Sequence, residues 1–378
     1  MHRFVTCLFL TGFPILEGTG VLCPMGRGKQ YFGYQEVSST NKYSWTKAAN
    51  GIWVDAPGST GFSEGPLETT FEGWVNNLYT FLSEFLKKHP DLNRKLYLAV
   101  GSFDATIVGM LAAKIIELKA PINLKGILLM SGISGPLDVY HGCLLKAVER
   151  KLVNRDTYDQ MIKAFPKCEE AISKCRPASP GGMPSRDDCK AARELCDGIF
   201  LVPVVNAGHS VYDVRTAPGE EKTMFKFKTG NAKVFFNLPD VQKALGVSKQ
   251  WTFQNKEVTN AYDMYALYNT TSAITLSLDA GLAVLVVHGE HDYITNAEGA
   301  PIWMSRLAGR FPYGKQLNKA KMTPLKVGGA VIGTAKLTNF LNHARFGFVK
   351  LDGSGHAISR CQPLPLQQLA QMFMIGGI

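Results

Sequence analysis

Long apolar runs are largely missing from this chain of 378 residues. The first 16 residues hold a short apolar stretch, and no later stretch of membrane-spanning length is apolar throughout. Because a helix needs about 20 apolar residues to cross a bilayer, the sequence predicts no membrane span. Runs of five or more basic residues and recognition motifs for DNA or RNA are missing as well. The formal charge of +10 is scattered, so we predict a solvated basic surface and no nucleic-acid partner.

Low-complexity segments and internal repeats are also absent, and charged residues make up only 19% of the chain. Hydrophobic residues account for 46%, which is enough for a large buried core. The composition therefore predicts a folded globular protein rather than a disordered one. The length allows two domains, although an α/β chain of this size is often one domain with an insertion.

Cysteine is well represented, with eight residues, and four of these form a near-symmetric set. Six residues separate Cys168 from Cys175, thirteen separate Cys175 from Cys189, and six separate Cys189 from Cys196. If two helices of a hairpin carry these pairs, a spacing of seven keeps each pair on one face, since seven residues are close to two turns. Nested bridges Cys168–Cys196 and Cys175–Cys189 would then form. A zinc site is the alternative, but metal sites usually use closer pairs, so we favour disulfides and predict no metal.

Disulfides indicate an oxidising compartment, and we expect a secreted protein or one of a lysosome- or vacuole-like compartment. The sequence Asn269-Thr270-Thr271 is an acceptor motif for N-linked glycosylation and is compatible with that location.

The first 16 residues allow two interpretations. A basic start followed by a short apolar run is typical of a signal peptide. The alternative is an internal strand at residues 4–10, followed by a loop at residues 11–15.

Apolar runs of strand length alternate with helix-like segments over the first third of the chain. Strand patterns cover residues 51–55, 96–100 and 126–130, and an apolar helical stripe runs from residue 71 to 88. Continuous apolar runs are typical of parallel strands buried on both faces, so the pattern predicts a parallel sheet with crossover helices. Strand patterns return at residues 282–287 and 346–351. Between them, residues 136–230 are charged, cysteine-bearing and helix-like, which indicates an inserted cap on a core formed by residues 1–135 and 231–378.

Three polar residues each follow one of these strands. Ser102 lies between a strand and a helix-like run, Asp292 follows the strand at 282–287, and His356 follows the strand at 346–351 in a glycine-rich loop. Catalytic groups gather at the carboxyl ends of strands in open α/β folds. The chain order serine, aspartate, histidine is that of α/β-hydrolases, in which the serine occupies a sharp turn. We therefore predict this fold and this catalytic set.

Each residue alone has a plainer explanation: Ser102 as a helix cap, Asp292 as a turn residue and His356 as a loop residue. Together they suit nucleophilic catalysis. A serine hydroxyl becomes nucleophilic when an imidazole takes its proton, and a carboxylate orients that imidazole and stabilises its cation. This chemistry requires no metal or cofactor, and we predict none.

Several further motifs resemble the serine carboxypeptidase family, peptidase family S10, from about residue 4 to the C-terminus. They lie at residues 41–45, 49–63, 122–127, 211–215, 237–245 and 355–356. The resemblance implies removal of the C-terminal residue of a peptide through an acyl-enzyme on Ser102. The substrate would be a peptide or protein C-terminus, and the sequence leaves a homodimer open. The family normally has further strands before this point, so the resemblance implies a chain shortened at its start.

The resemblance also assigns supporting residues. The family's oxyanion donors correspond to the backbone N–H groups of Phe13 and Phe103, and residues 11–15 align with a glycine-rich oxyanion loop. Residues 4–15 would then be a core strand and its loop rather than a signal peptide. Thr11, Gly12 and Gly101 take the family's substrate-binding positions.

The nucleophile turn departs from the family, which has Gly-Glu-Ser-Tyr-Ala-Gly there. Small residues belong two positions either side of the serine, where this chain has Val100 and Asp104. The Glu that helps to grip the substrate's terminal carboxylate is Gly101 here, and its Asn partner is Thr11. Phe13 replaces a glycine of the oxyanion loop, so that loop is expected to differ.

We therefore consider three functions. The first is a serine carboxypeptidase-like hydrolase. The second is a binding or secreted structural protein of the same fold with weak or no peptidase activity, which the altered turn and the missing carboxylate grip both favour. The third is an esterase or acyltransferase on this scaffold, because the three polar residues are kept while the carboxylate grip is not.

Overall fold

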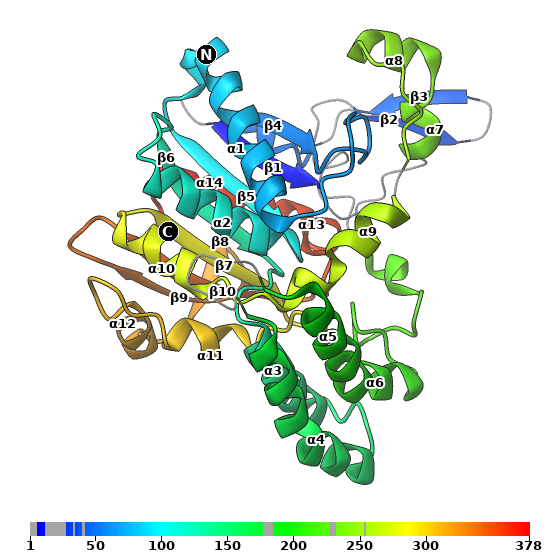
Figure 1. The fold of residues 1–378 in the computed structure, drawn as a ribbon, viewed down its shortest axis with the longest axis vertical. Coiled ribbons are helices and arrows are strands. Elements are labelled where there is room, and N and C mark those ends of the chain that lie inside the picture. Colours follow the sequence, from blue (N-terminus) through cyan, green and yellow to red (C-terminus); the bar gives the residue numbers. More distant parts are fainter. Residues whose placement is uncertain are drawn as a thin grey trace.

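The computed structural model describes seven stretches of the chain, and for the first three of them the main chain only. These stretches are residues 6–11, 28–32, 35–39, 42–176, 184–226, 232–252 and 255–378. Figure 1 shows a central sheet with helices on both faces and a group of helices that extends away from it.

The central sheet has eight strands in the order β4–β1–β5–β6–β7–β10–β9–β8. The strands are β1 (Thr6–Thr11), β4 (Asn50–Asp55), β5 (Leu96–Gly101), β6 (Leu124–Met130), β7 (Ala283–Gly289), β8 (Thr323–Val327), β9 (Ala330–Asn339) and β10 (Arg345–Leu351). Neighbours from β4 to β10 run parallel, while β9 is antiparallel to both β10 and β8. A separate antiparallel hairpin consists of β2 (Gly28–Phe32) and β3 (Gln35–Ser39).

The sheet is buried on both faces because successive side chains of a strand point to opposite sides. On β5, Leu96, Leu98 and Val100 belong to one apolar cluster, while Tyr97 and Ala99 belong to a second. All of these side chains are buried, which explains why the strand reads as a continuous apolar run. The apolar stretches of the sequence thus form the middle layer of a three-layer structure.

Helices cover both faces of the sheet (Figure 1). The first cluster joins the sheet to α1 (Phe71–Lys88), α2 (Asp104–Glu117), α9 (Lys256–Tyr262), α10 (Thr271–Asp279), α11 (Ala300–Ser305) and α12 (Tyr313–Lys319). The second joins it to η1 (Trp45–Lys47), α13 (Ile358–Cys361) and α14 (Pro363–Ile375). The remaining short elements are η2 (Pro90–Leu92), η3 (Glu221–Met224), α7 (Ala232–Phe236), α8 (Pro239–Leu245) and η4 (Asp263–Leu267).

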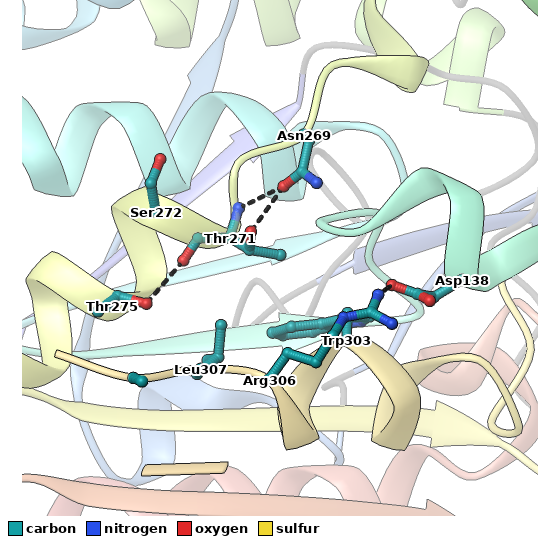
Figure 2. Close-up of a pocket in the computed structure, with 9 residues that line it drawn as sticks. Asp138, Asn269, Thr271, Ser272, Thr275, Trp303, Arg306 and Leu307 are labelled. Atoms are coloured by element: carbon teal, nitrogen blue, oxygen red, sulfur yellow. Dashed lines mark hydrogen bonds and ion pairs between the residues drawn. The ribbon is translucent and has the colours of Figure 1, made fainter. Parts of the chain in front are cut away.

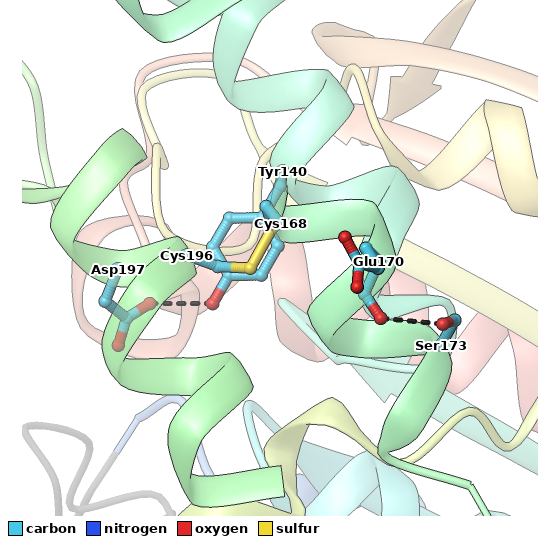
Figure 3. Close-up of a disulfide and its surroundings, with 6 residues drawn as sticks. All are labelled: Tyr140, Cys168, Glu170, Ser173, Cys196 and Asp197. Atoms are coloured by element: carbon cyan, nitrogen blue, oxygen red, sulfur yellow. Dashed lines mark hydrogen bonds between the residues drawn. A yellow bond between two sulfur atoms is a disulfide. The ribbon is translucent and has the colours of Figure 1, made fainter. Parts of the chain in front are cut away.

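Four helices form the group that extends from the sheet: α3 (Pro136–Glu149), α4 (Arg155–Lys174), α5 (Arg186–Phe200) and α6 (Val202–Asn206). Disulfides join Cys168 to Cys196 and Cys175 to Cys189, and all four side chains are buried. This is the predicted nested pairing, and the zinc-site alternative is excluded because the sulfur atoms are bonded to one another. Beside the first bridge, the Tyr140 hydroxyl donates to Asp197 at 2.7 Å (Figure 3). The helical, disulfide-bearing insertion is therefore confirmed, while the boundaries at residues 135 and 230 stay predictions.

The beginning of the described chain is part of the sheet. β1 pairs in parallel with β4 on one side and β5 on the other. Residues 6–11 are therefore an interior strand, as the second interpretation of the N-terminal sequence proposed. The loop expected at residues 11–15 lies, apart from Thr11, outside the described residues.

Candidate active site

Ser102 occupies a sharp turn between β5 and α2. Its backbone has φ +55°, a left-handed conformation that non-glycine residues rarely adopt. The Ser102 N–H donates to the carbonyl of Met130 at 3.0 Å, and the Ile133 N–H donates to the Ser102 carbonyl at 3.3 Å. These bonds tie the turn to the end of β6 and hold the serine at the carboxyl edge of the sheet, as a nucleophile elbow does.

The elbow forms despite the two larger residues beside it. Val100 and Asp104 are both buried, at 2% and 6% exposure. Room for the turn comes from the neighbouring segment: a Cβ added at Gly132 would lie 2.7 Å from the Cβ of Ala105. The absence of a side chain at Gly132 lets the loop after β6 approach the start of α2. The departures at positions 100 and 104 therefore leave the backbone of the elbow in place.

His356 joins Ser102 to Asp292 through its two ring nitrogens. Nε2 lies 3.0 Å from the Ser102 Oγ, and Nδ1 lies 2.9 Å from Oδ2 of Asp292. His356 and Asp292 are buried, at 2% and 0% exposure. The structure thus brings the three predicted side chains together in one hydrogen-bonded chain, from three separate strands.

Asp292 is held in its charged form. Burial alone would raise the pKa of Asp292, but the nearby His356 and the hydrogen bonds from His356 and Thr295 outweigh it. The pKa of Asp292 therefore lies below its usual value. A buried carboxylate in this state accepts hydrogen bonds and stabilises a positive charge on the adjacent imidazole.

Thr295 is a site residue that the sequence analysis did not identify. Its hydroxyl donates to Oδ2 of Asp292 at 2.5 Å and lies 2.9 Å from Nδ1 of His356, and its N–H donates to Oδ1 of Asp292 at 3.1 Å. The spacing of three residues after an aspartate is the available signal, since a short side-chain-to-backbone bond over three residues is typical of Asp and Thr in turns.

A second buried histidine lies under the site. His288 is on β7 and is 1% exposed. Burial lowers the pKa of His288 to about 4, and the nearby Asp292 only partly opposes this effect. At neutral pH the imidazole of His288 is therefore uncharged. It does not form an ion pair with Asp292, whose charge interacts with His356.

The loops that carry Asp292 and His356 are fastened to one segment of the chain, residues 211–214. The carbonyl of Tyr212 accepts the His356 N–H at 2.7 Å, and the N–H of Val214 donates to the carbonyl of His291 at 3.0 Å. The carbonyl of Val211 accepts the N–H groups of both residues that follow Asp292. This segment is one of the family-like motifs. Because it hydrogen-bonds to both loops, it fixes the position of Asp292 relative to His356.

The expected supporting residues are placed in part. Phe103 follows the serine directly and precedes α2, so its N–H lies at the elbow. Gly101 ends β5 and Thr11 ends the adjacent parallel strand β1, so both lie at the edge that carries Ser102. Gly12 and Phe13 lie outside the described residues.

The described part of the chain contains neither a candidate metal-binding cluster nor a candidate membrane-spanning helix. No group of three or more His, Cys, Asp or Glu side chains there is arranged to hold a metal ion. Among those same residues, no helix combines the length and the apolar character needed to cross a bilayer.

The strand order, the elbow and the hydrogen-bonded side chains define an α/β-hydrolase. The chain is similar in fold to Kex1(Δ)p, a prohormone-processing carboxypeptidase from Saccharomyces cerevisiae, with a TM-score of 0.76 and 16% identity over 98% of this chain and 83% of that one. This likeness confirms the predicted fold class.

The sequence comparisons define the family. The serine carboxypeptidase family model matches residues 19–376, so the chain belongs to that family. The match begins later than the start of the resemblance at about residue 4. Serine carboxypeptidase-like 48 from Arabidopsis thaliana is 29% identical over 90% of this chain and 66% of its own length. Carboxypeptidase Y from Schizosaccharomyces pombe is 27% identical over 89% of this chain and 35% of its own length. The chain thus spans about two thirds of the plant relative and about one third of the yeast one.

Proposed function

We propose that this protein is a serine carboxypeptidase that removes the C-terminal residue of a peptide through an acyl-enzyme on Ser102. One observation carries the proposal: Ser102, His356 and Asp292 form a continuous hydrogen-bonded chain, with distances of 3.0 and 2.9 Å, at a turn with φ +55°. Membership of the serine carboxypeptidase family supports peptides as the substrate class.

In the first half of the reaction, Nε2 of His356 takes the proton of Ser102 as Oγ attacks the carbonyl carbon of the last peptide bond. Asp292 orients the imidazole and stabilises the cation. The N–H groups of Phe103 and Phe13 would receive the oxyanion, and each such donor contributes roughly 3 kcal/mol to transition-state stabilisation. His356 then gives its proton to the leaving amine, and the carbon–nitrogen bond breaks.

In the second half, His356 takes a proton from water, and the resulting nucleophile attacks the acyl carbon on Ser102. The proton returns to Oγ as the ester bond breaks, which restores the serine and releases the shortened peptide. Nε2 of His356 handles the proton in every step, and the transfers from and back to Ser102 Oγ use the 3.0 Å contact.

A fluorophosphonate probe tests the nucleophile, because it reacts with an activated serine whatever the natural substrate. Labelling is expected for the wild-type protein and not for Ser102→Ala. No labelling of folded wild-type protein would rule out both enzymatic functions and favour a binding protein.

The peptidase activity is tested with a blocked peptide that ends in a free carboxylate and with its C-terminal amide. We expect the last residue to be released preferentially from the peptide that ends in a free carboxylate. Equal processing of the amide would contradict recognition of a terminal carboxylate.

An esterase or acyltransferase is the second candidate, and Gly101 favours it. Gly101 takes the place of the glutamate with which the family helps to grip the terminal carboxylate. A protein that labels with fluorophosphonate, cleaves esters and leaves the peptide acid intact would have this function.

We further propose a secreted location or a lysosome- or vacuole-like one, which the two disulfides support. A homodimer stays a prediction.

A further inference from the structure

An exposed asparagine precedes α10 on the side of the molecule that carries α11. Asn269 is exposed, whereas the next residue, Thr270, is fully buried and donates its N–H to the carbonyl of Ser134 at 3.0 Å. The buried threonine fixes the backbone of the segment while the asparagine faces solvent. Asn269-Thr270-Thr271 is the acceptor sequence for N-linked glycosylation, and this placement leaves its amide accessible.

The amide of Asn269 is oriented by the third residue of the motif. Its Oδ1 accepts the Thr271 hydroxyl at 2.7 Å and the Thr271 N–H at 3.0 Å (Figure 2). Because both bonds use the oxygen, Nδ2 lies on the other side of the amide group. The turn is local, spanning three residues, so it needs no tertiary structure to form.

A small pocket lies beside this asparagine. It has a volume of about 200 Å³, and Figure 2 shows that residues of α10 and α11 line it. Trp303 and Leu307 are the apolar lining residues and are 2% and 5% exposed, Thr275 lies on the opposite side, and Arg306 is ion-paired with Asp138 at the edge. At this size it is smaller than the roughly 300–1,000 Å³ of a typical ligand site, so it suits one small group better than a free ligand.

We propose that Asn269 carries an N-linked glycan and that its first N-acetylglucosamine lies in this pocket. The sugar combines hydroxyl and acetamido groups with an apolar ring face, which matches a mixed polar and apolar lining. Covalent attachment gives it a high effective concentration, so weak contacts suffice to seat it. The two disulfides indicate passage through an oxidising compartment, where such glycosylation occurs.

The modification requires a lipid-linked oligosaccharide pyrophosphate as donor and a host transferase. The bond between C1 of the first sugar and the pyrophosphate oxygen breaks, and a bond between C1 and Nδ2 of Asn269 forms. One Nδ2 proton passes to a base of the transferase, and the lipid pyrophosphate leaves.

The attachment is tested on the full chain directed into the secretory route of a eukaryotic host, with closure of both disulfides as the sign of entry. Mass spectrometry is expected to find a hexosamine-containing glycan at Asn269. Asn269→Asp and Thr271→Ala should abolish it, and Thr271→Ser should keep it. Oxidised protein without sugar at Asn269 would overturn the proposal.

The pocket is tested after an endoglycosidase trims the glycan to one sugar. The matched control is Asn269→Asp, which keeps the acceptor oxygen for Thr271 but carries no sugar. We expect a Tm higher by about 2 °C with the sugar, and no difference between the same two forms when Thr275→Phe fills the pocket. A glycosylated protein whose Tm equals that of the control would overturn the placement of the sugar. Neither result depends on hydrolase activity.

Discussion

The hydroxyl of Thr295 donates a hydrogen bond of 2.5 Å to Oδ2 of Asp292. The hydroxyl oxygen of Thr295 also lies 2.9 Å from Nδ1 of His356. Toward Nδ1 this oxygen can only accept a hydrogen bond, because its one proton is donated to the carboxylate. Both neighbours of Nδ1 are therefore acceptors, which assigns the ring hydrogen to Nδ1. Nε2 is left unprotonated toward Ser102, as a general base requires.

Thr295 is therefore expected to act as a positioning residue. Thr295→Val keeps the shape of the side chain but removes the hydroxyl, and one lost hydrogen bond to a charged group costs about 1.5 kcal/mol. We expect fluorophosphonate labelling to slow by about tenfold. Thr295→Ser, which keeps the hydroxyl, should label within about twofold of the wild type. Equal loss in both variants would indicate a packing role for the γ-methyl group instead.

The elbow at Ser102 predicts an unusual effect on stability. At φ +55° a residue with a Cβ atom adopts the left-handed backbone at a cost of about 1 kcal/mol relative to glycine. The free energy of unfolding of Ser102→Gly is thus expected to exceed that of Ser102→Ala by about 1 kcal/mol in denaturant unfolding, although neither variant has a nucleophile.

Ala105 provides a control of opposite sign for that comparison. It lies in the first turn of α2 and is buried, so Ala105→Gly should destabilise the protein by about 1 kcal/mol. If Ser102→Gly were no more stable than Ser102→Ala, the turn would not be strained.

The two disulfides are expected to stabilise the helices α3–α6. Cys168–Cys196 closes a separation of 28 residues and Cys175–Cys189 one of 14. Closure of loops of this size contributes about 3 kcal/mol by restricting the unfolded chain. Replacing Cys168 and Cys196 with alanine should increase proteolysis between residues 155 and 200. Reductant should increase proteolysis of the wild-type protein in the same region and should not change proteolysis of a variant that lacks both bridges. If reductant increased proteolysis of that variant, thiols other than these four would be responsible.

Much of the fold could be predicted because buried parallel strands are simple in sequence. The runs at 96–100, 126–130, 282–287 and 346–351 correspond to β5, β6, β7 and β10, and the helical stripe at 71–88 is α1. The hairpin of β8 and β9 was not predicted, since its strands are short or exposed. Its turn carries a usable signal, because Gly328 and Gly329 both have positive φ, as a two-residue hairpin requires.

The site was predictable only in part for a different reason. Ser102, Asp292 and His356 each follow a strand, so their convergence could be expected from topology. Thr295 could not be assigned from the sequence, because its role depends on a contact with His356, 61 residues away. Gly132 likewise matters through its approach to Ala105, which no sequence pattern reveals.

Burial of His288 predicts a pH dependence of stability. The pKa of His288 falls from 6.5 to about 4 on folding, mainly through burial. The unfolded chain therefore binds a proton more readily than the folded one between these values, and the free energy of unfolding falls as the pH falls through this window. Linkage gives a loss of about 2 kcal/mol between pH 7 and pH 5 from this group alone.

His288→Asn removes the titrating group, so denaturant unfolding of this variant should depend less on pH by about that amount. His89→Asn is the matched control, because it makes the same substitution at an exposed position. A lower stability of His288→Asn at pH 7 is expected from lost packing and does not affect the comparison, which uses the difference between pH 7 and pH 5. If both variants kept the wild-type slope, His288 would not be the group that resists protonation in the folded protein.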